Sequence, residues 1–477
     1  MRRLGTAFWG IDVNKRELLH MGLPGGACLE VANRTLAKAR QRGMKRARLH
    51  TEIRAIVKNP ETFRGHALFG ELAEAILAAR AARASYRERA DRAPYRQWGT
   101  DLDAAAVQQM ENACRLPVSA RGALMPDAHV GYGLPIGGVL GVRHAVIPYA
   151  VGVDIACRMK LTVLDLPLHA LGGQRERLRK TLEEETRFGI GASFRKRREH
   201  EVLDADWDVS SVTQRNRDKA WSQLGTSGSG NHFVEFGVLT LPQADLGLEA
   251  GEYLALLSHS GSRGTGASVA DHYSRLAMNL HPELPKELKH LAWLDLDSEP
   301  GQEYWQAMHL MGRYAAANHA CIHRAISRRL GVDVLLDIEN HHNFAWKEVH
   351  DDEEMVVHRK GATPAAAGVV GIIPGSMADP GYVVRGKGVA DSLDSAAHGA
   401  GRRMSRKQAK EQFRWKQASA YLEERQVVLL SAGLDEVPMA YKNIDEVMAA
   451  QAELVEVVAR FQPRLVKMAP EGERAED

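Results

Sequence analysis

The stretch GTSGSGNHFVEFGVL, residues 225–239, contains the pattern that decides the fold. A glycine- and serine-rich turn is followed directly by a short run of β-branched and aromatic residues. Similar stretches recur after about residue 95, at 131–142, 259–266, 368–377 and 398–402. Short strands joined by glycine-rich loops, with helices at irregular intervals, do not have the regular alternation of a βαβ fold. We therefore predict an α+β fold, with central β-sheets flanked by helices and loops gathered at one site.

Helical segments are predicted in this part of the chain at 301–330, 402–424 and 443–461. Residues 31–96 differ from it, because they are rich in Ala, Arg and Lys with apolar residues at helical spacing. They predict a pair of exposed helices with basic, solvated faces, or a surface that binds nucleic-acid phosphates. The predicted organisation is a mostly helical basic extension at 1–94 and one large catalytic domain at 95–477.

The composition is that of an ordinary globular protein, with 44% hydrophobic and 26% charged residues. A net charge of +3 is too small to indicate a polyanionic partner. Four separate cysteines without a CxxC pair predict reduced thiols. The N-terminus lacks the features of a signal peptide, and no apolar run is long enough to span a bilayer. We therefore expect a cytoplasmic protein without a membrane segment.

One thiol and several imidazoles lie beside glycine-rich turns, as does one carboxylate. Cys, His and Asp are ligands for zinc, manganese or iron, and a thiolate can bridge two ions. Each residue alone is a weak signal, because an isolated His or Cys is more often structural. Their scattering over several turns is typical of a catalytic centre assembled by the fold, and it indicates a possible metal site. The residues are Asp154, Cys157, His232, His259, His341 and His342.

Two further segments, IIPGSMADPGY (372–382) and AAHGAGRRMSR (396–406), have the character of anion-binding loops. Glycine-rich turns present backbone N–H groups to anionic oxygens, especially where they open a helix. Strong helix formers follow the second segment, so His398 is expected just before such a turn. An imidazole there could attack phosphorus and form a phosphoramidate. Neither segment matches the Walker or Rossmann patterns, and an N-cap turn with an incidental His is the alternative.

The whole set of segments resembles the RtcB family of RNA ligases. MPDAHVGYGLPIGG, VGVDIACRM, LGTSGSGNHFVEF, HSGSRGTG, HHN, HRKGATPA, IPGSM and HGAGRRMSR occur in the order and spacing of that family, from about residue 95 to 467. The resemblance implies a single large RtcB-like catalytic domain. It also implies a GTP- and manganese-dependent ligase acting in tRNA splicing or RNA repair. Such an enzyme joins a 3′-phosphate or 2′,3′-cyclic phosphate to a 5′-hydroxyl through a histidine–GMP intermediate.

The resemblance also implies the role of individual residues. One manganese ion would be held by Asp154, Cys157 and His232, and a second by Cys157, His259 and His342. His398 would carry the guanylate. Asp127 would lie close to the metal centre, and Arg263 would contact RNA phosphate. The guanine nucleotide would be held by Asn231, Phe233, Glu235, Asn343, Pro374, Gly375, Ser376, Met377, Gly399, Ala400, Gly401, Tyr441 and Lys467.

Two manganese ions, GTP as a co-substrate and RNA with these ends are thus the expected cofactors and partners. The resemblance further implies a monomer, with an archease-type activator among the candidate partners. Two positions depart from the family pattern. Arg158 replaces a glycine beside Cys157, where it could keep the thiol deprotonated or crowd the RNA end. Gly381 falls where a nucleotide-contacting serine is expected, at a cost of about 1 kcal/mol for one hydrogen bond.

Three other functions use the same sequence features. A dinuclear-metal phosphoesterase would use the metals without guanylylation and would tolerate the loss of His398. A 3′-phosphate guanylyl-capping enzyme would stop before ligation. A non-catalytic RNA-binding relative would depend on the basic N-terminal helices and would have no need of Cys157 and the metal-ligand histidines.

Overall fold

The computed structural model describes residues 15–24, 27–84 and 87–475, which form two compact units. One unit comprises residues 1–87 and 276–286, and the other comprises residues 88–275 and 287–477. The N-terminal residues on which the absence of a signal peptide was predicted, 1–14, lie outside the described part. Among the described residues, no helix combines the length and the apolar character needed to cross a membrane.

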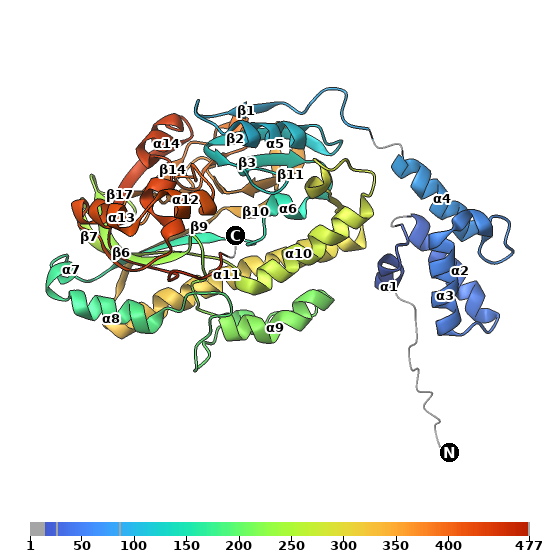
Figure 1. Cartoon of the computed structure of the whole chain (residues 1–477), viewed down its shortest axis with the longest axis horizontal. Coiled ribbons are helices and arrows are strands. Elements are labelled where there is room, and N and C mark those ends of the chain that lie inside the picture. The colour runs from blue at the N-terminus through green and yellow to red at the C-terminus, as the bar shows by residue number, and fades with distance from the viewer. Residues whose placement is uncertain (1–14, 25–26, 85–86, 476–477) are drawn as a thin grey trace, which may run out of the picture. The chain divides into compact units, whose positions relative to one another are not determined.

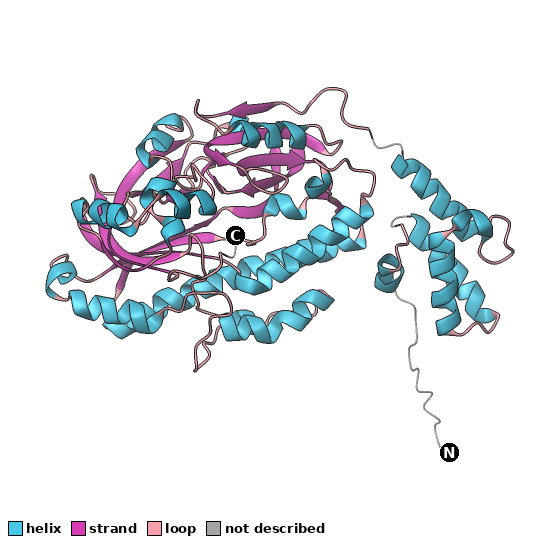
Figure 2. Ribbon diagram, viewed as in Figure 1, coloured by secondary structure: helices cyan, strands magenta, loops and turns pink. Residues whose placement is uncertain are grey.

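The N-terminal unit consists of helices and their connections (Figures 1 and 2). Apolar side chains from these helices, among them Leu36, Ile53 and Leu72, are buried together in a core of their own. The prediction of two helices was therefore wrong in number, and the apolar spacing belongs to a separate small core, while the basic side chains are exposed as predicted. The helices are α1 (Lys15–His20), α2 (Ala27–Gln41), α3 (Arg46–Lys58) and α4 (Gly70–Ala84).

The second unit is built on an eight-stranded sheet in the order β13-β14-β17-β6-β7-β5-β9, with β16 paired to β17. All of its pairings are antiparallel except that of β16 with β17. The strands are β5 (Arg158–Leu164), β6 (Phe233–Leu241), β7 (Gly251–Ser260), β9 (Val334–His341), β13 (Val370–Ile373), β14 (Gly381–Gly386), β16 (Val428–Ser431) and β17 (Val455–Met468).

Helices cover one face of this sheet. The long helix α11 (Glu299–Leu330) packs against β5 and β7, and α8 (Arg175–Glu185) packs against α11. Leu254 and Leu256 of β7 point toward these helices, whereas Ala255 and Leu257 belong to the core on the other face. The alternation follows from the two-residue period of a strand. The other helices of this unit are α5 (Ala104–Cys114), α6 (Pro148–Val151), α7 (Ala170–Gly173) and α9 (Ser211–Gln223), and α10 (Arg263–Leu280) begins in it.

A five-stranded sheet with the order β1-β2-β3-β11-β10 forms the other layer of this unit (Figure 1). Residue 342 alone separates β9 of the first sheet from β10 of the second. Two small ribbons pair β12 (Ala362–Pro364) with β15 (Ser395–Ala397) and β4 (Ala145–Val146) with β8 (Leu294–Asp295). The five strands are β1 (Tyr95–Gln97), β2 (Ser119–His129), β3 (Ile136–Val142), β10 (Asn343–His350) and β11 (Glu353–Lys360).

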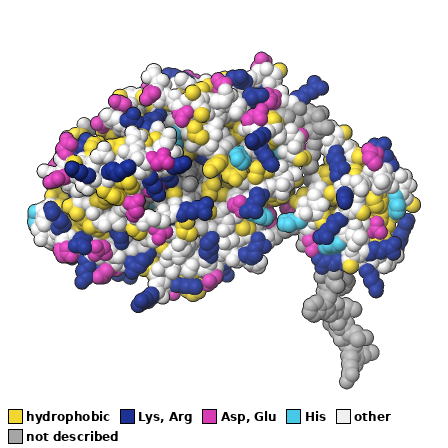
Figure 3. Space-filling view, in the orientation of Figure 1, with side chains coloured by type: hydrophobic (Ala, Val, Ile, Leu, Met, Phe, Trp, Pro, Cys, Tyr) yellow, Lys and Arg dark blue, Asp and Glu magenta, His cyan; other side chains and the backbone are white. Residues whose placement is uncertain are grey.

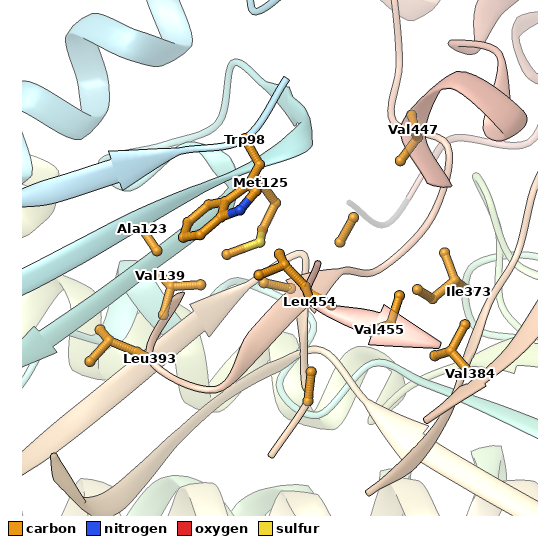
Figure 4. Close-up of a cluster of buried hydrophobic side chains, with 14 of the residues drawn as sticks. Trp98, Ala123, Met125, Val139, Ile373, Val384, Leu393, Val447, Leu454 and Val455 are labelled. Atoms are coloured by element: carbon orange, nitrogen blue, oxygen red, sulfur yellow. The ribbon is translucent and has the colours of Figure 1, made fainter. Parts of the chain in front are cut away.

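An apolar core joins the two sheets (Figure 4). Met125 and Val139 from the five-stranded sheet pack with Val384 and Val455 from the eight-stranded sheet, and Trp98 is buried in the same cluster. Each large apolar side chain buried in this way contributes roughly 1.5–3 kcal/mol. The core therefore holds the two sheets in a fixed arrangement around the loops that emerge beside it. The mixed α+β fold with a helical N-terminal region is confirmed.

The segment 402–424, predicted as one helix, is two helices. They are α12 (Arg406–Gln412) and α13 (Trp415–Glu424). Phe413 and Arg414 are extended between them, and Phe413 packs into a small apolar cluster. No proline or glycine marks this break, so propensity alone missed it.

The segment 443–461 was predicted as one helix, and only its first part is helical. Helix α14 (Ile444–Ala450) ends there, and β17 begins at Val455. The run VEVVARF has apolar residues that fit both periods, and its valines favour the strand.

Candidate active site

Four neighbouring strands of the eight-stranded sheet bring the candidate metal ligands to one edge. Cys157 directly precedes β5, His232 directly precedes β6, His259 lies near the end of β7, and His342 directly follows β9. The strand pairing places Phe233 opposite His259 and Arg158 opposite His341. Because adjacent antiparallel strands run in opposite directions, strand starts and strand ends meet at the same edge.

The donor atoms of these side chains converge. Cys157 Sγ lies 3.1 Å from His259 Nε2 and 3.4 Å from His232 Nε2. One donor atom from each of these three residues lies within 4.8 Å of the others, and all three side chains are buried. His342 Nε2 lies 3.2 Å from His259 Nε2, and Asp154 Oδ2 lies 3.2 Å from His232 Nε2. A buried set of one thiol, three imidazoles and one carboxylate fits divalent metal ions.

Glycine at two positions makes room for this cluster. Asp154 accepts hydrogen bonds at Oδ1 from the Ser262 backbone N–H and hydroxyl. A Cβ atom added to Gly261 would lie 2.0 Å from Asp154 Oδ2, and one added to Gly228 would lie 2.4 Å from His232 Nδ1. Any larger residue would displace the candidate ligands, and these contacts explain the glycine-rich segments of the sequence.

Two of the imidazoles, His259 and His342, are held in the neutral form, which is the form that binds metals. Burial, together with the neighbouring His232, lowers the pKa of His259 to about 3. Burial and the neighbouring imidazoles hold the pKa of His342 well below its usual range. Although burial opposes it, the hydrogen bond and charge of His232 lower the pKa of Asp154 and keep it ionised.

Residue types alone left open which of His341 and His342 belongs to the cluster, and the family resemblance implied His342. The His342 ring faces His259, with ring centroids 5.1 Å apart. The His341 ring packs instead against Phe344 and Trp346, at centroid distances of 5.2 and 5.0 Å. The structure therefore brings His342 to the cluster and turns His341 away from it.

His398 follows β15 and is held by a buried carboxylate. Asp127 Oδ2 lies 2.7 Å from His398 Nδ1 and also accepts the His398 backbone N–H at 3.2 Å. Asp127 therefore contacts His398 rather than the metal-ligand cluster. The ring of His398 lies 4.8 Å from that of His342, between centroids, so the two groups are neighbours. An Nδ1–H donated to Asp127 leaves the Nε2 lone pair of a neutral imidazole available.

The GAGRRMSR segment opens a helix, as expected, although the turn at residues 398–401 lies before the helix begins. Helix α12 begins at Arg406, where the Ser405 side chain caps it. Gly401 has a φ of +72°, and a Cβ atom there would lie 2.2 Å from the Asp127 carbonyl oxygen. The glycine thus lets the turn fold closely against the residue that binds His398.

One cavity of about 780 Å³ contains most of the predicted site residues. It brings the five candidate metal ligands and His398 together with two glycine-rich loops and two aromatic rings. The predicted residues that line it are Asp154, Cys157, Asn231, His232, Phe233, His259, His342, Asn343, Pro374, Gly375, Ser376, Met377, His398, Gly399, Ala400, Gly401 and Tyr441.

Four predicted residues do not line the cavity. One is Asp127, which is fully buried and contacts His398. Glu235 is buried and lies two residues after Phe233 on β6. Its burial raises its pKa well above the usual range. Lys467 pairs with Val234 on β6, so it lies on the face opposite Phe233, and its Nζ donates to the Thr186 hydroxyl at 3.0 Å. Arg263 is 2% exposed and donates from Nε to the Thr226 hydroxyl. Its guanidinium lies close to Gly228, where an added Cβ atom would be 2.2 Å from it.

The two departures from the family pattern also lie outside the cavity. Arg158 points to the helix-covered face of the sheet, where it binds Glu339 and the Gly312 carbonyl oxygen. It therefore does not crowd the space in front of Cys157. Gly381 begins β14, and a Cβ atom there would meet only ordinary contacts of 3.4 Å or more. Neither position alters the cavity.

The cavity also contains cations that the residue-level prediction did not include. Arg402 and Arg406 bind Glu436, and Arg402 lies over the ring of Tyr441 at 5.2 Å. The exposed Arg403 lines the same wall, and Lys360 and His129 line other parts of it. The arginines fall within the quoted GAGRRMSR segment, so its charge was the available signal. Their presence gives the cavity a basic wall suited to phosphate groups.

Two histidines of α11 support the cluster from behind. Ser258 Oγ lies 2.9 Å from His319 Nδ1 and 2.8 Å from His323 Nε2. His319 Nε2 lies 3.0 Å from the Ser260 carbonyl oxygen. These contacts fix β7 on both sides of His259, as outer partners of metal ligands do. Their spacing of four residues on one helix was a signal that the sequence prediction did not use.

Lys360 provides a test of the electrostatics of the cavity, because burial lowers its pKa to about 7. In the unfolded chain the pKa returns to 10.5, so between pH 7 and 10.5 the unfolded chain binds more protons. The free energy of unfolding should therefore rise with pH across this range, by about 2 kcal/mol from pH 7 to 9. Lys360→Met should make this rise shallower in urea unfolding curves, because Lys467 and Lys442 also have lowered pKa values, and Lys347→Met, at an exposed position, should retain the full rise. An unchanged slope in Lys360→Met would show that the ammonium keeps its ordinary pKa.

Comparisons with known proteins agree with this geometry. A family model described as tRNA-splicing ligase RtcB matches residues 109–468. The chain is 35% identical to an Escherichia coli protein named RNA-splicing ligase RtcB1, over 77% of this chain and 95% of that protein. It is 31% identical to the tRNA-splicing ligase RtcB of Thermococcus kodakarensis, over 75% of this chain and 89% of that protein. A protein of the same name from Nanoarchaeum equitans is 32% identical, over 74% of this chain and 90% of that protein.

Proposed function

The chain belongs to the RtcB family of RNA ligases, and we propose that it joins RNA ends through a guanylate carried on His398. The substrates in this proposal are GTP and RNA ends bearing a 3′-phosphate, or a 2′,3′-cyclic phosphate, and a 5′-hydroxyl. The observation that carries it is the His398–Asp127 pair, placed beside a buried Cys/His cluster in one cavity. A nucleophile held by a carboxylate next to a metal-ligand set suits phosphoryl transfer.

His398 acts as the nucleophile in this mechanism. Asp127 accepts a hydrogen bond from Nδ1–H, which stays on the ring, and holds the imidazole so that the Nε2 lone pair attacks the α-phosphorus of GTP. An N–P bond forms while the bond from the α-phosphorus to the bridging oxygen breaks, and pyrophosphate leaves. The guanylate then passes to the RNA 3′-phosphate, which breaks the N–P bond and restores His398. Attack by the 5′-hydroxyl finally forms the phosphodiester and releases GMP.

The metal ligands in this proposal are the five converging side chains. Asp154, Cys157 and His232 would hold one manganese ion, and Cys157, His259 and His342 a second, with the thiolate of Cys157 shared. When bound, the ions neutralise charge on the attacking and leaving oxygens at phosphorus. The neutral imidazoles of His259 and His342 support this assignment. The choice of manganese rests on the family, because zinc accepts the same donors.

The nucleotide in this proposal contacts residues that line the cavity. Phe233 and Tyr441 offer aromatic faces to the guanine base, and the glycine-rich turns at 374–377 and 399–401 offer backbone N–H groups to its phosphates. Asn231 and Asn343 offer side-chain amides. Glu235 and Lys467 would contact the nucleotide only if their side chains turned toward the cavity. Arg263 would likewise have to turn toward the cavity to contact RNA phosphate. Arg403, which is exposed at the cavity wall, is better placed for that contact.

The wider assignments follow from the same proposal. Residues 95–477 form the catalytic domain, and the protein acts as a cytoplasmic monomer in tRNA splicing or RNA repair. An archease-type activator is its candidate protein partner.

The proposal is tested by joining two RNA strands. One strand ends in a 3′-phosphate and the other begins with a labelled 5′-hydroxyl, and the reaction contains GTP and Mn²⁺. We expect a joined product that depends on GTP. Substrates bearing a 3′-hydroxyl and a 5′-phosphate serve as the control and should not be joined. Phosphate release without joining would indicate a phosphoesterase, and accumulation of guanylylated 3′-ends would indicate a capping enzyme.

A further inference from the structure

The charge of the chain is divided unequally between its two parts. Residues 1–87 contain 17 Lys and Arg against 7 Asp and Glu, a net charge of +10. Residues 88–477 contain 46 against 53, a net charge of −7. The catalytic part of this RNA ligase therefore has a net charge of the same sign as its substrate. Long-range attraction of a polyanion must then come mainly from the N-terminal part.

The positive charge of the N-terminal unit is concentrated where α2 ends and α3 begins. Six of the eleven residues from 38 to 48 are Lys or Arg, and none is Asp or Glu. We call the exposed cations of this stretch the α2–α3 basic surface, which consists of Lys38, Arg42, Lys45, Arg46 and Arg48. The side chain of Arg48 is 72% exposed and that of Lys38 is 58% exposed. Lys and Arg side chains are spread over the visible face of this unit in Figure 3.

Arg46 of this surface binds Glu17, whereas the ion pairs of Lys38 and Arg48 are long and exposed. Lys38 Nζ lies 3.6 Å from Glu71, and Arg48 Nε lies 3.7 Å from Glu52. Exposed pairs of this kind contribute only about 0–1 kcal/mol, so they do not prevent the cations from meeting phosphate groups. Helix α3 also begins with Lys45 as its N-cap and no acidic residue in its first turn. Cations at the positive end of a helix repel its dipole, and an anion bound there offsets that repulsion.

The side chains around this surface favour a nucleic-acid backbone over other anionic partners. Within the described residues of the N-terminal unit, no large hydrophobic side chain is exposed. Insertion into a lipid surface needs such side chains, and stacking on unpaired bases needs exposed aromatic rings. A surface of cations alone suits sequence-independent contacts with the phosphates of paired RNA.

We propose that the α2–α3 basic surface binds the phosphate backbone of a paired region of the RNA substrate, away from the ends that are joined. This inference rests on the proposed function, because it takes RNA as the substrate. In this proposal the N-terminal unit supplies affinity for RNA, and the cavity carries out the joining reaction. The contact is independent of sequence.

The test measures binding of a paired RNA hairpin that has a 3′-hydroxyl and therefore cannot be guanylylated. Fluorescence anisotropy gives Kd at several salt concentrations for the full chain and for the variant Arg42→Gln/Lys45→Gln/Arg48→Gln. Loss of three phosphate contacts should raise Kd on the order of tenfold and make the slope of log Kd against log salt shallower by about 2 to 3.

Two further variants separate this surface from net charge and from loss of folding. Arg54→Gln/Lys58→Gln/Arg64→Gln removes the same charge from exposed positions elsewhere in the unit, and Kd should stay close to that of the wild type. Arg42→Lys/Lys45→Arg/Arg48→Lys keeps the charge and should keep the salt slope. Thermal unfolding of all three variants should match the wild type, because these side chains are exposed.

The proposal is overturned if the Arg42/Lys45/Arg48 variant binds the hairpin with the wild-type Kd and salt slope. It is also overturned if both glutamine variants weaken binding equally, or if polyglutamate or phosphatidylserine vesicles bind this surface more tightly than the hairpin. Covalent labelling by GTP labelled at the α-phosphate should be unaffected in the Arg42/Lys45/Arg48 variant. Absence of labelling in the wild type would instead overturn the proposed function, while hairpin binding would still test the surface.

Discussion

Replacing His398 with alanine is expected to abolish covalent labelling of the protein by GTP labelled at the α-phosphate. In the proposed mechanism Nε2 of His398 forms the N–P bond. The other described cavity imidazole beside a carboxylate is His232, and it is a candidate metal ligand. Loss of a nucleophile typically lowers the rate by ~10⁵-fold or more. The measurement is retention of label on denatured protein, together with its release by acid, which is the behaviour of a phosphoramidate.

Two variants define what this result means. Asp127→Asn should slow labelling by about 10²- to 10⁴-fold without abolishing it, because the amide no longer fixes the tautomer with its lone pair on Nε2. His129→Gln removes another imidazole that lines the same cavity and should leave the label in place. A label that persists in His398→Ala would exclude His398 as the nucleophile. Labelling of Asp127→Asn at the wild-type rate would exclude the proposed role of the carboxylate.

Replacing Cys157 with serine is expected to remove metal binding and, with it, ligation. Sγ lies between two of the imidazoles, at 3.1 and 3.4 Å, and the proposed ions share it. A serine hydroxyl is not deprotonated at neutral pH and is a poor ligand, so the affinity for Mn²⁺ should fall more than 100-fold, beyond the effect of losing an outer partner (~10- to 100-fold). Isothermal titration of the chelated protein with Mn²⁺ measures this loss. Cadmium binding adds a direct signature, because thiolate–cadmium charge transfer absorbs in the ultraviolet.

Cys321 supplies the matched control for this experiment. It is 1% exposed, lies on α11 and belongs to none of the contacts among the candidate ligands. Cys321→Ser should therefore bind Mn²⁺ and cadmium as the wild type does and keep the charge-transfer band. Full Mn²⁺ affinity in Cys157→Ser, or a cadmium–thiolate band that survives in it, would contradict the assignment of Cys157.

The sequence was sufficient to predict which segments form the site. It was not sufficient to predict how single side chains in those segments point. Residue types and glycine-rich turns identified Cys157, His232, His259 and His398, and the structure brings all four into one cavity. Local composition can indicate such residues because ligand atoms and close backbone approach need particular residue types. The predicted α+β fold likewise followed from local patterns.

Orientation depends on strand register, which no local pattern contains. Lys467 and Met468 are neighbours in sequence, yet only Met468 lines the cavity, because successive residues of β17 point to opposite faces. Residue types alone could not choose between His341 and His342, because that choice depends on where β9 ends; only the family resemblance implied His342. The break between α12 and α13 depended on the packing of Phe413. Each of these features is decided by partners that are distant in the sequence.

The position of His342 between the two sheets has a consequence for folding cooperativity. This residue is the only one that connects β9 of the eight-stranded sheet to β10 of the five-stranded sheet. Its Nε2 atom faces Nε2 of His259 on β7. An ion held by both imidazoles would cross-link the two layers, in addition to the apolar core between them. At a free concentration of 100 times Kd, such binding adds about 2.7 kcal/mol to the free energy of unfolding. Chelation should then allow the two layers to open independently, and amide hydrogens of β10 and β11 should exchange before those of β5 and β7.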